Sequence, residues 1–544
     1  MAGLPPIDER TMRATYERVL ATRPDELAQT DSGGPVTFAE SYSRALRLAA
    51  GFTAAGVGRQ EPAALLLDNS LDLVHAFTGL ALGGMVEVPV NTAYKGRFLA
   101  HILNDSQAAV AVVEDGYLDR LAAIADDLTS LRTIVVRGDR ARAGALADRF
   151  RVMPFAELES AGSRSPAPAD AGDLVAYMYT SGTTGLSKGV LISHAHAYTY
   201  ASREDQDRPR ADDRILVTLP LFHLAGQWYG VYQALIHQVS CWVEPGFSAS
   251  GFWPTVRQHG ITVTVTLGAM AELLQQQPPR PGEADNPLEL TVMAPLASDV
   301  HGFSQRFGVA TAAVYGMSEI GCVLNGPPET IVPGEAGFPR EEYTLRLVDA
   351  DGHDVRPGEV GELWVLPADP RIVLRGYHNL PDKTAETLVD GWVHTGDAFR
   401  RDAAGHFFFS DRMKDALRRR GENISSFEVE RVINEYPAVY ESAVVGVPSD
   451  LTEDEIKAVI VPRDGQRIDP AELTAFLIER LPYFMVPRYL EFTGALPKTP
   501  TQKVHKHLLR ERGAGRSVWD REAAGIVLRR GTAQRGTAQR GTAQ

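Results

Sequence analysis

The chain has 544 residues, of which 44% are hydrophobic and 23% are charged. This composition excludes wholesale disorder, and the length predicts three or four structural units. A formal net charge of −14 argues against a nucleic-acid backbone or an anionic membrane as the main partner, because such surfaces need clustered Lys and Arg. Two cysteines, Cys241 and Cys322, are too few for a disulfide framework, which favours a reducing compartment.

The first residues contain acidic side chains and no apolar core, so they do not predict a signal peptide. The longest apolar stretch, 73–86, is shorter than the roughly 20 residues that cross a bilayer. We therefore expect a cytoplasmic protein without membrane attachment.

Helical and strand patterns alternate through the first half of the chain. Amphipathic helices are expected at 38–56, 71–84 and 227–236, and short apolar strands at 61–69, 85–91, 108–113, 174–180, 215–220 and 262–267. This alternation indicates an α/β fold with parallel-type sheets.

The pattern changes after Pro333 to alternating β segments with Asp-Gly and Pro-Gly turns, which predicts a β-rich subdomain at about 333–412. From residue 413 the order is helix, strand, strand, helix, typical of a small α+β unit. The chain ends in three copies of RGTAQ, which cannot bury a core. We expect a large N-terminal domain at 1–412, a small C-terminal domain at 413–515 and a disordered tail at 516–544.

Residues 179–189 read YTSGTTGLSKG and follow an apolar strand directly. Gly, Ser and Thr allow successive N–H and hydroxyl groups to surround an anion, and Lys188 adds a positive charge. The segment is not a Walker A loop, because Lys188 lies three positions after Gly185 and is followed by Gly189. Alone, it is equally consistent with a flexible surface loop.

Five further segments indicate a more specific function: LPLFHLAG (219–226), VYGMSE (314–319), GWVHTGD (391–397), SDRMKDALRRRGENIS (410–425) and LPKTPTQKVHKHLLR (496–510). Singly, each has a common structural explanation, such as a core histidine, a solvated carboxylate, a turn or a charged surface. Together and in this order they resemble the adenylate-forming superfamily, which comprises acyl- and aryl-CoA synthetases, peptide-synthetase adenylation domains and luciferases. The resemblance extends from about residue 37 to residue 510 and implies a mobile C-terminal domain.

The resemblance also implies roles for individual residues. The catalytic residues would be Lys503, His223 and Glu319, with Glu319 also holding Mg²⁺. ATP and AMP would be bound by Thr180, Ser181, Gly182, Thr183, Thr184, Gly185, Lys188, Ala294, Pro295, Tyr315, Gly316, Met317, Ser318, Glu319, Asp397, Arg412 and Lys503. Lys414 would be the hinge, and Gly421, Glu422, Asn423 and Ile424 would border the coenzyme A tunnel. The acid pocket would contain Phe222, His223, Gln227, Trp228, Leu267, Gly268, Val314 and Cys322.

The function implied is an ATP-dependent carboxylic acid:CoA ligase, which forms an acyl-AMP with release of pyrophosphate and then a CoA thioester. Its small-molecule partners would be a carboxylic acid, ATP and coenzyme A, and its metal would be Mg²⁺. Whether the protein forms a homodimer is left open. No Asp lies between Leu221 and Tyr229 to pair with a substrate ammonium, which disfavours an α-amino acid.

The chain departs from the family pattern at Ser187, where Pro is usual, and at Gln502 in place of Gly. It also has Val292 and Met293 in place of small residues, and their larger side chains are expected to narrow the wall beside the adenine and the acid pocket. These departures keep two alternatives open. One is an adenylate-forming enzyme with another acceptor or nucleophile, such as a carrier-protein thiol, an amine, or a non-carboxylate oxyanion such as nitrite. The other is a non-catalytic nucleotide-binding homologue.

Overall fold

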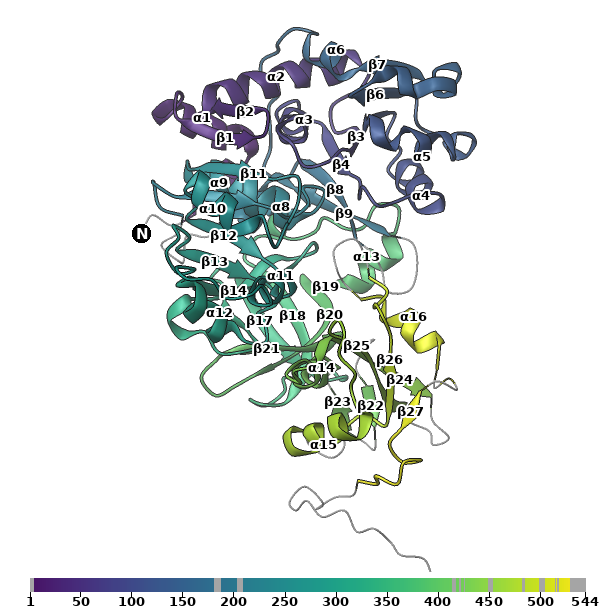
Figure 1. The fold of residues 1–544 in the computed structure, drawn as a ribbon. Coiled ribbons are helices and arrows are strands. Elements are labelled where there is room, and N and C mark those ends of the chain that lie inside the picture. The colour runs from purple at the N-terminus through teal and green to yellow at the C-terminus, as the bar shows by residue number, and fades with distance from the viewer. Residues whose placement is uncertain are drawn as a thin grey trace, which may run out of the picture. The chain divides into compact units, whose positions relative to one another are not determined.

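The computed structural model describes residues 4–180, 187–202, 209–412, 417–419, 422–424, 426–448, 454–481, 485–498, 504–513, 515 and 518–528. Its contacts divide the chain into two compact units (Figure 1). The first contains Met1–Arg346, Trp364–Thr395 and Ala404–Phe407, and the second contains Leu347–Leu363, Gly396–Ala403 and Phe408–Gln544. None of the helices among these described residues is long and apolar enough to cross a bilayer.

The first unit contains a seven-stranded sheet in the order β7-β6-β5-β3-β4-β8-β9. Its strands are β7 (Arg151–Pro154), β6 (Thr133–Arg137), β5 (Val110–Glu114), β3 (Pro62–Leu66), β4 (Val86–Pro89), β8 (Leu174–Thr180) and β9 (Lys188–Ser193). All neighbours are parallel except β8 and β9, which form an antiparallel hairpin. Parallel strands joined through helices confirm the expected α/β class.

Helices α4 (Arg97–Asp105) and α5 (Leu118–Ala122) cover one face of this sheet. Leu99 and Leu103 of α4 and Leu121 of α5 pack with Val86 and Val88 of β4 in one buried cluster. Because side chains alternate along a strand, Glu87 of β4 points to the opposite face.

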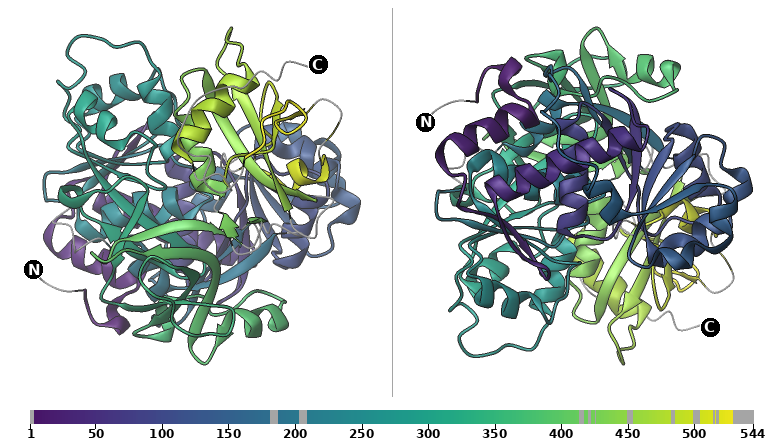
Figure 2. Two further views of the ribbon diagram at one scale, coloured as in Figure 1. Left: turned by 90° about the horizontal axis from the view of Figure 1, so that it is seen from below. Right: turned by 90° about the horizontal axis from the view of Figure 1, so that it is seen from above.

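Helices α1 (Met12–Thr22), α2 (Phe38–Ala54), α3 (Leu71–Leu82) and α6 (Phe155–Glu159) form a further helical layer, in which α2 and α3 lie side by side (Figure 2). A capping box between Thr37 and Glu40 begins α2. The helices approach closely because Gly79 has no side chain, and a Cβ there would lie 2.7 Å from the Ala45 carbonyl oxygen.

The second sheet of this unit contains, in spatial order, β16 (Glu335–Pro339), β15 (Gly321–Gly326), β14 (Ala310–Met317), β13 (Leu290–Met293), β12 (Val263–Thr266), β10 (Arg214–Val217), β11 (Ser240–Val243), β1 (Leu27–Asp31) and β2 (Gly34–Thr37). The strands from β14 to β1 are parallel, whereas the outer strands β15, β16 and β2 are antiparallel. Core residues of α10 (Phe252–His259), α11 (Gly268–Gln275) and α12 (Val300–Phe307) pack on one face together with Met293.

The opposite face of this sheet meets the segment that was expected to be one helix at 227–236. It is instead divided into a π-helix η6 (Gln227–Tyr232) and α9 (Gln233–His237), and the short α8 (Leu224–Gly226) precedes them. Gly230 of η6 lies against the sheet, because a Cβ there would be 2.9 Å from Val217. Helix α7 (His194–Ala201) packs beside this π-helix. Single π-helical turns within helices frequently occur at functional sites.

Four strands contain residues of both units: β17 (Tyr343–Val348), β18 (Val360–Pro367), β20 (Trp392–Arg401) and β21 (Phe407–Arg412). The short elements α13 (Pro381–Thr387) and β19 (Leu388–Val389) precede β20 in the sequence.

The second unit has a four-stranded sheet of β24 (Val439–Pro448), β25 (Asp454–Pro462), β26 (Tyr489–Phe492) and β27 (Trp519–Asp520). Helices α14 (Ser426–Asn434), α15 (Pro470–Arg480) and α16 (Lys506–Glu511) pack around it, and β22 (Leu417–Arg419) pairs with β23 (Glu422–Ile424).

Candidate active site

The strands on either side of the predicted phosphate loop form the β8–β9 hairpin. Thr180 lies opposite Lys188, and Tyr179 lies opposite Gly189. The Tyr179 ring lies across Gly189, where a Cβ would be 3.1 Å from the nearest ring atom. A residue larger than glycine after Lys188 would therefore push this ring away. The loop residues Ser181, Gly182, Thr183, Thr184 and Gly185 lie outside the described residues.

Lys188 and Glu319, which are far apart in the sequence, meet on the side chain of Tyr377. The Lys188 Nζ lies 5.1 Å from the centre of the Tyr377 ring, and the Tyr377 hydroxyl donates a 2.9 Å hydrogen bond to Glu319 Oε1. Glu319 is only 7% exposed. A cation–π contact and a hydrogen bond thus place an ammonium and a carboxylate on one aromatic side chain. Sequence reasoning missed Tyr377, because nothing in its local sequence marks it.

The predicted adenine-binding residues lie at the carboxyl ends of neighbouring parallel strands. Tyr315, Gly316 and Met317 end β14, and the Ala294–Pro295 peptide follows β13. No side chain fits at Gly316, where a Cβ would be 2.3 Å from the Gly321 carbonyl oxygen. In open α/β sheets, ligands bind beyond the carboxyl ends of the strands, so this edge suits a nucleotide.

The predicted acid-pocket residues gather around the π-helix and the end of β14. His223 caps α8, since its Nδ1 accepts a 3.3 Å hydrogen bond from the Ala225 N–H. Trp228 is buried and packs edge-to-face with Tyr200, with 6.1 Å between the ring centres. Burial and the adjacent Cys322 raise the pKa of Tyr200. Phe222, Leu267 and Val314 are half-buried, and Gly268 packs against the Pro295 carbonyl.

Gln227 has a partner that the sequence did not reveal. Its Nε2 donates to both carboxyl oxygens of Glu87, at 2.6 and 2.7 Å. Its Oε1 is buried and has no hydrogen-bond partner among the residues that the structure describes. Burial raises the pKa of Glu87 to about 8, although the hydrogen bonds from Gln227 favour the ionised form. Glu87 is therefore mainly protonated at neutral pH. The available signal was an acidic residue within an apolar strand, MVEVPV.

Val292 and Met293 are both fully buried, but they point to opposite faces of the sheet. Met293 belongs to the core beneath α12, and its Sδ accepts a hydrogen bond from the Ala297 N–H at 3.1 Å. Val292 pairs with Val265 and so shares the face that meets the π-helix. The expectation that both residues narrow the acid pocket is thus wrong for Met293, which fills the helix-covered core, whereas Val292 lies on the appropriate face.

The remaining predicted residues belong to the second unit. Asp397 is buried on β20, Arg412 ends β21, Glu422 and Asn423 lie on β23, and Ile424 is buried in the core of the unit. Lys414, Gly421 and Lys503 lie outside the described residues. Roles in ribose binding, hinge motion, coenzyme A binding and catalysis therefore stay predictions for this group.

The two ends of the segment that carries Lys503 are described, and they are joined to one another. Lys498 and Val504 form an antiparallel bridge, and the His505 N–H donates to the Pro497 carbonyl at 2.8 Å. Lys498 forms an ion pair with Glu441, and Lys506 lies 2.8 Å from Glu430. The base of this lysine loop is therefore fixed to α14 and β24.

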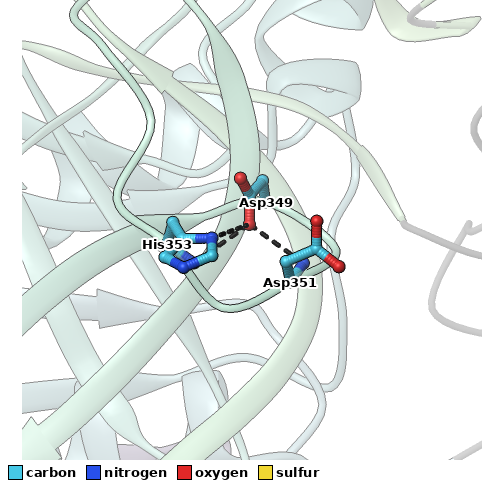
Figure 3. Close-up of side chains that lie close together, drawn as sticks. All are labelled: Asp349, Asp351 and His353. Atoms are coloured by element: carbon cyan, nitrogen blue, oxygen red, sulfur yellow. Dashed lines mark hydrogen bonds and ion pairs between the residues drawn. The ribbon is translucent and has the colours of Figure 1, made fainter.

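A separate group, Asp349, Asp351 and His353, brings potential metal-ligating atoms together on the surface (Figure 3). Asp349 Oδ1 already accepts hydrogen bonds from the N–H groups of Asp351 and His353, both at 2.9 Å. These bonds, chiefly the one from His353, lower the pKa of Asp349. The arrangement stabilises an exposed turn, and we assign no ion to it.

Comparisons with known proteins identify relatives that match most of the chain. The chain is 33% identical over 497 residues to a feruloyl-CoA synthase of an Amycolatopsis species, which covers 90% of this chain and 96% of that protein. It is 32% identical over 506 residues to the fatty acid–[acyl-carrier-protein] ligase ScoC of Streptomyces coeruleorubidus, covering 89% and 93%.

Solved structures show the same fold. The anthranilate CoA ligase AuaEII in complex with anthranoyl-AMP superposes with a TM-score of 0.85 at 26% identity, covering 93% of this chain and 98% of that one. ATP-bound MatB from Rhodopseudomonas palustris gives a TM-score of 0.80 at 27% identity, covering 91% and 98%. Residues 16–378 match the AMP-binding enzyme family, and residues 428–503 match the AMP-binding enzyme C-terminal domain. The chain belongs to the AMP-binding enzymes, within the adenylate-forming superfamily.

Proposed function

We propose that the protein is an ATP-dependent carboxylic acid:CoA ligase. The observation that carries the proposal is the meeting of Lys188 and Glu319 on Tyr377, in a chain whose full-length relatives include CoA synthases. An ammonium and a carboxylate held together suit a triphosphate that is bound with a divalent cation.

A carboxylate does not react with a thiol at neutral pH, because it has no adequate leaving group. In the first step a carboxylate oxygen attacks the α-phosphorus of ATP and forms a bond to it. The bond between the α-phosphorus and the oxygen that bridges it to the β-phosphorus breaks, and pyrophosphate leaves. In the second step the thiol of coenzyme A loses its proton to solvent and its sulfur attacks the acyl carbon. A carbon–sulfur bond forms, and the bond from that carbon to the phosphate oxygen breaks, so that AMP leaves. Catalysis of such steps rests on positioning and on neutralising charge.

Within the first unit, Lys188 and the hydroxyl and N–H groups around Thr180 would bind the terminal phosphates. Glu319 offers the hard oxygen ligand that Mg²⁺ prefers, and the ion would offset the phosphate charge. Tyr315 and the 294–295 peptide would flank the adenine. Lys503 of the second unit would bridge the acid and the α-phosphate, and Asp397 and Arg412 would bind the ribose.

The second step requires Lys503 to leave and a thiol to enter. We propose that the second unit rotates about Lys414 between the two steps, so that residues 421–424 border the entering thiol. Rotation about a few backbone torsions is an established way to gate an enzyme. The enzyme would act in the cytoplasm.

The acid would be an aryl or medium-length acid. The buried Trp228 and its neighbour Tyr200 provide an aromatic wall, and Val292 occupies a position on the same side of the sheet as the π-helix. Relatives with 30–33% identity include a feruloyl-CoA synthase and a crotonobetaine/carnitine–CoA ligase, so the family relationship alone leaves the acid open.

The test is a panel of aryl and aliphatic acids in a pyrophosphate-release assay, followed by measurement of AMP with and without coenzyme A. We expect acid-dependent pyrophosphate release and a large increase in AMP when coenzyme A is added. AMP release that does not respond to coenzyme A would contradict the assignment of the acceptor.

A carrier-protein thiol is the second candidate acceptor, favoured by the 32% identity to ScoC over nearly the whole chain. Holo-carrier protein in place of coenzyme A separates the two. Acylation of the carrier protein with no turnover of free coenzyme A would support this second function.

A further inference from the structure

One short helix, α4, contacts both ends of the predicted phosphate loop. His101 and Asp105 are four residues apart, so they lie on the same face of α4. His101 Nε2 donates a 2.8 Å hydrogen bond to the carbonyl of Ser187, at the downstream end of the loop. Asp105 Oδ2 accepts a 2.7 Å hydrogen bond from the hydroxyl of Tyr179, at the upstream end.

Ser187 has a second partner just before α4. The hydroxyls of Tyr94 and Ser187 share a hydrogen bond of 3.2 Å, and Ser187 is buried. A proline, which is usual at this position in the family that the chain resembles, has no hydroxyl and could not form this bond. The departure at Ser187 is thus matched by a tyrosine that uses it.

The same helix is tied to the segment that carries Tyr377. His378 Nε2 donates to the Asp105 carbonyl at 2.9 Å, and Asn379 Nδ2 donates to it at 3.2 Å. The His378 N–H in turn donates to the Gly189 carbonyl at 2.8 Å. Burial, together with the hydrogen bond to Asp105, raises the pKa of Tyr179, so its hydroxyl stays protonated and remains a donor.

We infer that α4 is a clamp that sets the position of both loop ends, and that Tyr94, His101 and Asp105 are positioning residues for nucleotide binding. The inference rests on the proposed function, since it assigns the clamp to the ATP-binding step. None of the three residues has to contact ATP. Loss of a clamp bond displaces the ends of the loop and should weaken ATP binding without altering the acid pocket.

The experiment compares His101→Ala and Tyr94→Phe with the wild-type enzyme in acid-dependent pyrophosphate release. We expect His101→Ala to raise the KM for ATP by about five- to tenfold, the worth of one or two hydrogen bonds, with the KM for the acid unchanged. Tyr94→Phe removes only a hydroxyl and should raise it by about two- to threefold. His101→Gln keeps an N–H donor and should restore most of the ATP affinity.

The matched control is Asn104→Ala on the same helix. Asn104 hydrogen-bonds to the Asp127 carbonyl and the Thr129 N–H, away from the phosphate loop, so its loss should lower stability and leave the KM for ATP unchanged. Hydrogen exchange of the peptide 174–193 supplies a readout that is independent of activity. It should accelerate in His101→Ala and not in Asn104→Ala.

Three results would overturn the clamp: an unchanged KM for ATP in His101→Ala, equal changes for ATP and acid, or the same change in Asn104→Ala. Unaltered exchange of 174–193 in His101→Ala would also overturn it. If the wild-type enzyme releases no pyrophosphate with any acid, the proposed function fails first, and the clamp's role in ATP binding fails with it.

Discussion

In the first unit, the support for the candidate site includes one buried hydrogen-bonded pair and half-buried hydrogen bonds to the downstream end of the predicted phosphate loop. Glu87 is mainly protonated and bonds to Gln227, while His101 and Tyr94 bond to Ser187. In the second unit, the ends of the lysine loop are supported by ion pairs whose side chains are 15–24% exposed, Lys498 with Glu441 and Lys506 with Glu430.

This difference fits what each unit would do. A site that holds ATP through the reaction benefits from rigid support, and the buried pair of Glu87 and Gln227, in which Glu87 is mainly protonated, provides it without the cost of burying charge. A loop that must enter and leave can be supported by partly exposed ion pairs, which salt weakens. The comparison predicts that the two sets of supports respond differently to mutation, pH and salt.

The largest effect is expected from Lys503→Ala, which removes the amine that the second unit would bring to the α-phosphate. Loss of one such charge-stabilising donor costs about 10²–10³ in rate. Pyrophosphate release should fall by that factor, while thioester formation from a synthetic acyl-AMP should stay near the wild-type rate. Near-normal pyrophosphate release would reject the role of Lys503, and the lysine loop of the second unit would then have no part in the first step.

The next effect concerns the pH dependence of stability. Because burial raises the pKa of Glu87 from its ordinary value of 4.5 to about 8, the folded state binds a proton that the unfolded state has lost between these pH values. Glu87 should therefore make the free energy of unfolding fall as pH rises from about 5 to 8, by up to about 1.4 kcal/mol per pH unit, and then level off.

Urea unfolding of the wild type and Glu87→Gln between pH 5 and 9 measures this slope. The amide cannot titrate, so the variant should lack this component, and the gap between the two curves should change with pH. Parallel curves across the range would show that Glu87 is ionised in the folded protein, and the neutral character assigned to the Glu87–Gln227 pair would be wrong.

A smaller effect is expected from Glu430→Gln. The amide oxygen can still accept the hydrogen bond that the Val444 N–H donates to Glu430 Oε1 at 2.7 Å, so mainly the charge that pairs with Lys506 is lost. Pyrophosphate release should fall by about two- to fivefold, in line with the contribution of a partly exposed ion pair. The exposed Glu435 on the same stretch of chain provides the control, and Glu435→Gln should have no effect.

The smallest effect tests the charged character of the lysine-loop support. Raising the salt concentration from 0.05 to 0.5 M should reduce the difference between wild type and Glu430→Gln by about twofold, because a partly exposed ion pair is screened. The ratio of the two rates cancels the general effect of salt on ATP binding. A ratio that is independent of salt would indicate that Glu430 acts through packing alone.

The fold class followed from the alternation of apolar strands with amphipathic helices, and the parallel sheets confirm it. Local sequence could not show Tyr377 or Glu87 as partners of Lys188, Glu319 and Gln227, because these contacts join elements that are far apart in the chain. It also assigned Met293 to the acid pocket, since a strand sequence alone does not say which face a residue occupies.

The central claim is that the enzyme activates an acid as its adenylate before any thiol takes part. Exchange of labelled pyrophosphate into ATP, measured with each acid in the absence of coenzyme A, tests it most directly. We expect exchange that depends on one class of acid and disappears in Lys503→Ala. Thioester formation accompanied by ADP and phosphate, with no exchange for any acid, would contradict it.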